Sequence, residues 1–146
     1  MYRLTYFSEN HLDYRNNEAR EGIGRILDKS RENNRRMLLT GALILDNLWF
    51  IQSIEGDRQH VWRTFQSIYA DNRHHNVVIA QAGDVEGRLF GEWSMAFATR
   101  TAETATIFDA HSHGNRINPT LMSAKNLLEL LQKTAASNVS PFLSAV

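Results

Sequence analysis

Hydrophobic and polar residues alternate at the start of the chain and then change to a helical spacing. Residues 2–8 alternate apolar and polar side chains, a period of two that is typical of a β-strand. Residues 9–17 are mostly polar and are expected to form a loop. The apolar residues from Ile23 to Leu27 then follow one face of a helix among charged neighbours, which predicts a helix over residues 17–32.

The next part of the chain has the pattern of a hairpin followed by a second helix. Two apolar runs, residues 38–45 and 49–54, flank Asp46 and Asn47, and this arrangement predicts a β-hairpin. Asp57 is expected to cap a second amphipathic helix. The apolar face of that helix consists of Val61, Phe65 and Ile68.

Two more strands complete the expected sheet. They are predicted at residues 77–82 and 93–98, with a charged loop over residues 83–91 between them. The order of elements is therefore β-α-β-β-α-β-β. Two crossover helices on one face of a mixed sheet predict an α/β (α+β) fold, a ferredoxin-like sandwich with right-handed crossovers.

The remaining residues, 101–146, are expected to form a C-terminal helical extension. Asn118 is the predicted cap and Pro119 the first residue of its helix. The predicted apolar stripe consists of Leu121, Ala124, Leu128 and Leu131, with Leu127 beside it. Because the two crossover helices leave one face of the sheet bare, we expect this stripe to pack there, although pairing with another chain is the alternative.

Composition excludes several classes of function. The 146 residues include 16 Lys+Arg and 16 Asp+Glu, so the net charge is zero, which argues against nucleic-acid binding. Cysteine is absent, which excludes disulfides, thiolate metal sites and cysteine nucleophiles and fits a cytoplasmic protein. No signal peptide and no apolar run of about 18 residues is found, so we expect no contact with a membrane. Asp109, His111 and His113 are expected to lie in a loop of the extension, and no metal site is predicted.

The candidate chemistry lies in uncharged hydrogen-bonding side chains near the expected slot beside the first helix. They are Tyr6, Ser30, Asn33, Asn34 and Gln52. Amides donate and accept hydrogen bonds at once, so this set suits a flat heteroaromatic ligand with mixed donors and acceptors. It suits acid–base hydrolysis poorly. Any one of these amides could instead simply satisfy loop backbone.

Five sequence blocks, in register over about residues 1–100, give the site a family resemblance. They are LTYFS, SRENN followed by LLTG, FIQSIEG, IYADNRHHNV and RLFGEWSMAF. Together they resemble the BLUF domains, a family of flavin-binding blue-light sensors. The chain departs from commoner family patterns at Asn33, at Asn72 and in the hairpin GALILDNLWF.

The resemblance implies a noncovalent oxidised flavin, usually FAD, held between the two helices. Tyr6 matches the tyrosine that donates an electron and a proton to the excited flavin. Gln52 matches the glutamine between that tyrosine and the flavin, whose rotation or tautomerisation would shift absorption to the red. Asn34 matches the asparagine at the flavin carbonyls.

The resemblance also assigns Ile26 and Ser30 to the ring, and Asp71, Arg73 and His74 to the ribityl chain and phosphates. Asn33 falls where some relatives have a ring-stacking side chain. Lys29 and Arg31 could reach the phosphates, although a solvated helix surface is the simpler interpretation.

Trp93 and Met95 match the pair of residues that carries the family's switch, of which one is near the site at a time. In a strand they would point to the same face.

The resemblance divides the chain into a flavin-binding domain, residues 1–100, and the helical extension, residues 101–146. It implies a short stand-alone sensor, not an enzyme, that signals through a protein partner or through its own oligomeric assembly. Two other functions remain open. A flavin-dependent reductase or other small-molecule enzyme would use His74 or Arg73 on its substrate and turn over with a nicotinamide cofactor. A flavin-free interaction module would be colourless.

Overall fold

A computed structural model describes residues 1–11, 16–46 and 48–137. The middle of the expected loop 9–17, the turn residue Asn47 and the last nine residues of the extension lie outside the described residues. The elements are β1 (Tyr2–Asn10), α1 (Asn17–Met37), β2 (Thr40–Leu45), β3 (Trp49–Gly56), α2 (Arg58–Tyr69), β4 (His74–Asp84), β5 (Ala96–Ala98), α3 (Ala105–Ala110), a 3-10 turn (Pro119–Leu121) and α4 (Ala124–Ser137).

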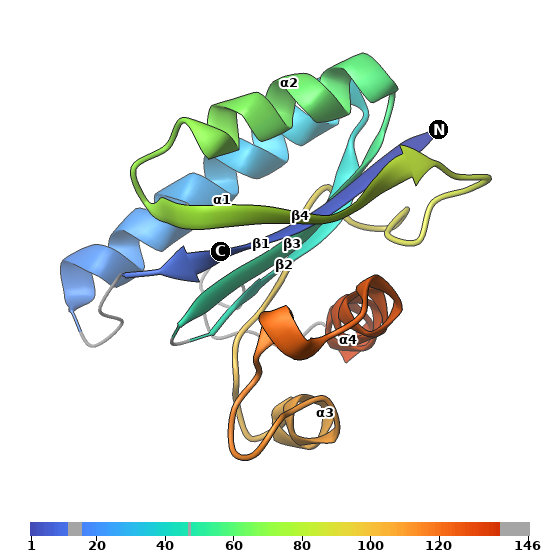
Figure 1. Cartoon of the computed structure of the whole chain (residues 1–146). Helices are drawn as coiled ribbons and strands as arrows, with labels where there is room; N and C mark the ends of the chain where they lie inside the picture. The colour runs from blue at the N-terminus through green and yellow to red at the C-terminus, as the bar shows by residue number, and fades with distance from the viewer. Residues whose placement is uncertain (12–15, 47, 138–146) are drawn as a thin grey trace.

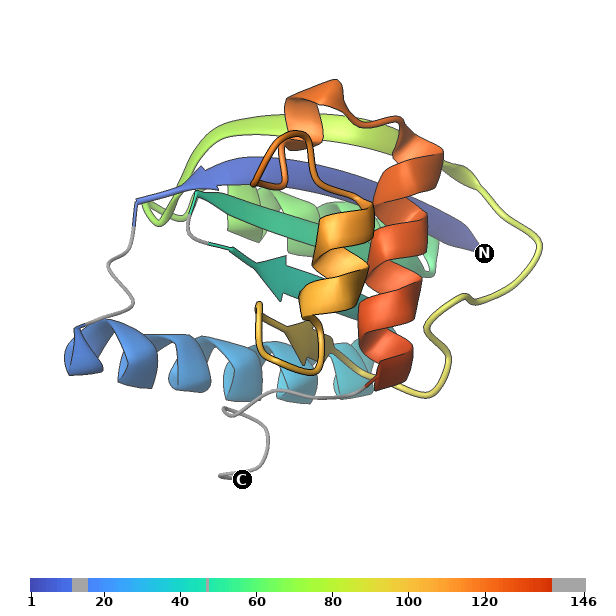
Figure 2. The same cartoon turned by 90° about the horizontal axis from the view of Figure 1, so that it is seen from below.

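The five strands form one sheet between two layers of helices. The strand order is β4-β1-β3-β2-β5, antiparallel throughout except that β5 runs parallel to β2. The helices α1 and α2 cover one face, and α3 and α4 lie side by side on the other (Figures 1 and 2). The expected α/β sandwich with a helical extension is confirmed. Within the described residues, no helix is both long and apolar enough to cross a membrane.

The face under α1 and α2 carries the first core, to which β1 and β3 contribute alternate residues. Leu4 and Ile54 are fully buried there, together with Val61 of α2. The predicted cap of α2 is confirmed, because the Asp57 side chain accepts hydrogen bonds from the backbone N–H groups of the first turn. Burying each such aliphatic side chain contributes about 1.5–3 kcal/mol of transfer free energy.

The opposite face carries a second core, which α4 covers. Leu127, Leu130 and Leu131 are fully buried against residues of β2 and β3 such as Ile44 and Ile51. The extension therefore packs within the chain, as expected for a sheet with one bare face.

The predicted apolar stripe of the extension is wrong in detail. Asn118 and Pro119 begin a separate 3-10 turn, and Asn118 caps that turn by accepting from the backbone N–H of Thr120. The long helix begins only at Ala124, so Leu121 belongs to another element and is 61% exposed. Leu128 is only partly buried, because the face of α4 that packs on the core carries Leu127, Leu130 and Leu131.

Several element boundaries also differ from the prediction. Glu9 and Asn10 belong to β1, where they pair with β4, and are not loop residues. Helix α1 continues to Met37 and ends where Leu38 adopts a left-handed φ of 55°. Strand β5 begins at Ala96, because the three residues before it do not join the ladder with β2.

Asp109 lies inside α3, not in a loop. Its carboxylate accepts from Arg100 at 2.8 Å, and His111 donates to the Ile107 carbonyl from the end of the same helix. Sequence patterns missed α3, which is only six residues long.

Candidate functional site

Tyr6 and Gln52 are cross-strand partners on the face under α1 and α2. They lie opposite each other in the β1–β3 register, and the Tyr6 hydroxyl donates to Gln52 Oε1 at 2.5 Å. Both side chains are buried, Tyr6 completely. The Tyr6 ring packs edge-on against Phe65 of α2, with ring centroids 5.5 Å apart. Adjacent strand positions therefore hold the phenol and the amide in contact.

Met95 completes a chain of polar contacts with these two residues. Gln52 Nε2 donates to Met95 Sδ at 3.5 Å, and Met95 is buried in the first core. The Gln52 amide is thus oriented by both ends, with its oxygen toward Tyr6 and its nitrogen toward the sulfur.

The expectation that Trp93 and Met95 share one face is wrong. Trp93 packs against the second core, whereas Met95 lies in the first. Both residues precede β5, so the two-residue alternation of a strand does not apply to them. The sequence left open which of the two would lie near Gln52, and in this structure it is Met95.

Two side chains of helix α1 donate hydrogen bonds to the backbone just before β5. Asn34 Nδ2 donates to the Ser94 carbonyl at 2.6 Å, and Arg31 Nε donates to the Met95 carbonyl at 3.0 Å. Burial lowers the pKa of the Arg31 guanidinium from its ordinary value. Neither interpretation of Arg31 from the sequence, a phosphate contact or a solvated surface, describes this contact. The available signal was its position three residues before Asn34, on the same helix face.

The other α1 residues predicted for the site lie along the same helix with different exposure. Ile26, Ser30 and Asn33 are partly buried, and Lys29 is exposed. The Asn33 side chain accepts from the Arg36 guanidinium at 2.6 Å.

Burial fixes the protonation state of Tyr6. Desolvation raises the pKa of the phenol well above its ordinary range, and the negative charge of Asp71 adds to the shift. The hydroxyl is therefore neutral, with a proton to give, at any physiological pH.

The Asp71, Arg73 and His74 group forms an ordered turn that leads into β4. The backbone N–H and Nε of Arg73 each donate to Asp71 Oδ1 at 2.9 Å, and these contacts hold the pKa of Asp71 at about 2. The His74 ring lies against Phe50 and beside Tyr6, with ring centroids 4.6 and 5.9 Å apart. His74 Nδ1 lies 2.8 Å from Ser8 Oγ.

His74 is uncharged near neutral pH. Burial lowers the pKa of its imidazole to about 4, against the opposing pull of Asp71. The Arg73 charge is already matched by Asp71. This group thus offers hydrogen bonds rather than free positive charge.

The chemistry of these side chains fits a flavin. A phenol, three carboxamides and a serine hydroxyl present mixed donors and acceptors, as a flat heteroaromatic ring with carbonyl and N–H edges requires. Helix α1 also approaches the strands less closely than α2, which packs directly on β1, β3 and β4.

Comparison with known proteins identifies the family of this chain. A family profile described as "BLUF: Sensors of blue-light using FAD" matches residues 1–96. The chain belongs to the BLUF family. The solved structure titled "BlsA ground state" has a TM-score of 0.81 and 26% sequence identity, and the match covers 97% of this chain and 91% of that one. The structure titled "BlrB - a BLUF protein, dark state structure" has a TM-score of 0.75 and 28% identity, over 93% and 96% of the two chains.

The protein is thus a BLUF blue-light sensor of the flavin-binding type. A curated relative, "Photoactivated adenylate cyclase subunit beta" of Euglena gracilis, is 29% identical over 115 residues. That match covers 74% of this BLUF chain and only 13% of the cyclase subunit.

Proposed function

We propose that this BLUF domain binds FAD and responds to blue light through Tyr6, Gln52 and Met95. Asn34, Ser30 and Ile26 would hold the ring beside them. Lys29, Asn33, Asp71, Arg73 and His74 would complete the binding site toward the ribityl chain and phosphates. When bound, the oxidised flavin would supply blue-light absorption and an excited state that can accept an electron and a proton from Tyr6, both of which would return to Tyr6 afterwards. The observation that carries the proposal is the continuous contact from the Tyr6 hydroxyl through the Gln52 amide to the Met95 sulfur.

Tyr6 is the proposed source of both the electron and the proton. A phenol is a usable one-electron donor, and its raised pKa keeps the proton in place until the electron leaves. The short contact to Gln52 Oε1 gives that proton a path to the amide.

Gln52 is the proposed switch because its two ends are not equivalent. Rotation of the amide would turn Oε1 toward Met95 Sδ, and a thioether sulfur has no proton to donate. Two acceptors would then face each other in a buried site, which is unfavourable. The rotated amide therefore favours displacement of Met95, whose backbone is held by Arg31.

The test is the absorption spectrum of Tyr6→Phe before and after blue illumination. We expect the variant to stay yellow, because a ring remains in the core, and to lose the reversible red shift. Tyr69→Phe is the matched control, since Tyr69 lies on α2 but is 65% exposed. A normal red shift in Tyr6→Phe would refute the mechanism. Release of the chromophore and its chromatography against FAD and FMN identifies the flavin.

We further propose that the domain itself is not an enzyme and passes its signal on by protein contacts. The absence of cysteine agrees with the reducing cytoplasm, where we propose that it works. A change of homo-oligomeric assembly is one form that these contacts would take. Sedimentation of the flavin-loaded protein in darkness and under blue light tests this form, and identical profiles would leave a separate protein partner as the receiver.

A further inference from the structure

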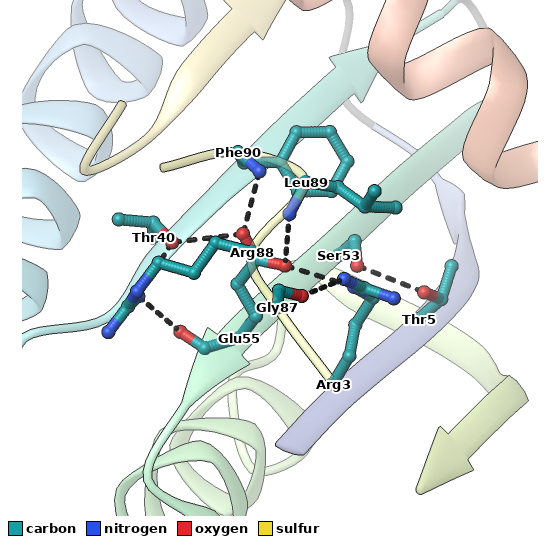
Figure 3. A network of polar contacts seen from close by, with 9 residues as sticks. All are labelled: Arg3, Thr5, Thr40, Ser53, Glu55, Gly87, Arg88, Leu89 and Phe90. Carbon is teal, nitrogen blue, oxygen red and sulfur yellow. Dashed lines mark hydrogen bonds and ion pairs between the residues drawn. The ribbon is translucent and has the colours of Figure 1, made fainter. Parts of the chain in front are cut away.

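Glu55 is a completely buried carboxylate that the photochemical site does not use. It lies on β3, and four groups donate to it: Arg3 Nε at 3.0 Å, the Thr40 hydroxyl at 3.0 Å, and the backbone N–H groups of Leu89 and Phe90 at 3.0 and 2.7 Å (Figure 3). Arg3 supplies the compensating positive charge. A buried charge so fully paired would be strongly destabilising if one partner were removed.

The carboxylate holds a particular stretch of chain, residues 87–90, against the sheet. Arg88 adds to this hold, because its guanidinium donates to the Thr40 hydroxyl at 2.8 Å (Figure 3). It also donates to the Leu38 carbonyl at 2.8 Å. Arg3 also donates to the Gly87 carbonyl at 2.9 Å. Residues 87–90 are loop, so these side-chain contacts take the place of a strand ladder.

Residues 87–90 connect directly to Met95. The Trp93 N–H donates to the Phe90 carbonyl at 3.0 Å, and the Gly41 N–H donates to the Trp93 carbonyl at 3.2 Å. Two residues later the chain reaches Met95, the contact of Gln52. These backbone contacts therefore join the segment held by Glu55 to the residue that contacts Gln52.

The same segment also contacts α4. The Phe90 ring is fully buried in the second core with Leu127 and Leu130. Leu89 borders a depression of about 580 Å³, and Lys125 and Leu128 of α4 line its other side. Residues 87–90 thus touch α4 on one face of the sheet and lead to Met95 on the other.

We propose that Glu55 is a positioning residue that holds residues 87–90 in darkness, and that displacement of Met95 draws these residues away from Glu55 and is thereby passed to α4. This inference rests on the proposed function, since it takes Met95 as the moving group. A carboxylate is required because all its neighbours are donors. The amide of Glu55→Gln would direct an N–H group at one of them.

The experiment is site-resolved amide hydrogen exchange of the flavin-loaded protein in darkness and under blue light. We expect the Leu89 and Phe90 amides to be protected in darkness and to exchange at least about tenfold faster in light, as for loss of a hydrogen bond to a charged acceptor. In Glu55→Gln we expect fast exchange at both amides in both states. The red shift should persist, while the light-dependent change in exchange over α4 is lost.

The outcomes separate positioning from a purely structural role. If Glu55→Gln only lowers the melting temperature and keeps the light response of α4, the inference is wrong. It is also wrong if the wild type shows a red shift with unchanged protection at residues 89 and 90. No red shift in the wild type would instead remove the proposed function and the inference together. Asp109→Asn, which removes an exposed carboxylate from its pair with Arg100, is the matched control and should respond like the wild type.

A milder variant keeps the test valid if Glu55→Gln does not fold. Arg88 is exposed, so Arg88→Met should fold while it removes the contacts to Leu38 and Thr40. We expect a partial loss of the α4 light response with a normal red shift. An unchanged α4 response in this variant would count against the inference.

Discussion

His74 allows a quantitative test of the electrostatics of the site. The imidazole is partly buried between Phe50 and Tyr6, and its Nδ1 contacts Ser8. Burial lowers its pKa from 6.5 to about 4. The proposed perturbation is His74→Phe, which keeps a ring against Phe50 and removes the titrating group.

The direction and size of the effect of pH on the free energy of unfolding follow from proton linkage. Above pH 6.5 the imidazole is neutral in the folded and unfolded chains, so its pKa shift costs nothing. As the pH falls from 6.5 to 4, the His74 imidazole is protonated in the unfolded chain but stays neutral in the folded chain, so the folded state loses stability. A lowering of about 2.5 in pKa corresponds to at most about 3 kcal/mol, complete near pH 4. Asp71 titrates in the folded state at about pH 2, below this window.

The assay is urea unfolding of the flavin-free protein at several pH values from 7.5 to 4. We expect the wild type to lose up to about 3 kcal/mol more than His74→Phe over this range. The difference between their pH profiles cancels groups common to both. An identical profile in the variant would refute the low pKa.

Three further predictions follow from contacts on both faces of the sheet. Met95→Leu removes the acceptor for Gln52 Nε2 and should change the dark recovery rate after illumination, whereas Trp93→Phe should leave the flavin spectrum unchanged; equal effects on recovery would contradict the geometry. Leu130→Ala should lower the unfolding free energy by about 2–5 kcal/mol, while Leu121→Ala should change it by less than about 0.5 kcal/mol in the same urea titrations. Arg31→Met should lower the melting temperature by about 2–4 °C through loss of its bond to the Met95 carbonyl, and an unchanged melting curve would refute that contact.

The fold could be predicted from the sequence because hydrophobic periodicity reports burial. The alternation in β1 and the helical spacing in α2 each mark an apolar face of the element. That face lies in the core in both cases. The errors occur where local contacts override periodicity. Leu121 has the spacing of a core residue, yet the Asn118 cap starts a separate turn and leaves it exposed.

The contact between Tyr6 and Gln52 followed from residue types and family blocks, and the β1–β3 register brings the two together. Arg31 could not be predicted in the same way. Its partner is a backbone carbonyl 64 positions away, and every residue has such a carbonyl, so residue types do not indicate the contact. Glu55 was likewise visible only as one letter of a matched block, because two of its four donors are backbone N–H groups.

The choice between Met95 and Trp93 depends on backbone that belongs to neither strand nor helix. Asn34 and Arg31 hold the carbonyls of Ser94 and Met95, and this orientation directs the Met95 side chain to Gln52. We expect that an arrangement with Trp93 beside Gln52 would need this backbone to turn, which would break both hydrogen bonds. Together they contribute roughly 1–3 kcal/mol. The proposed rotation of the buried Gln52 amide would have to offset a free-energy difference of this size for the two arrangements to act as a two-state switch.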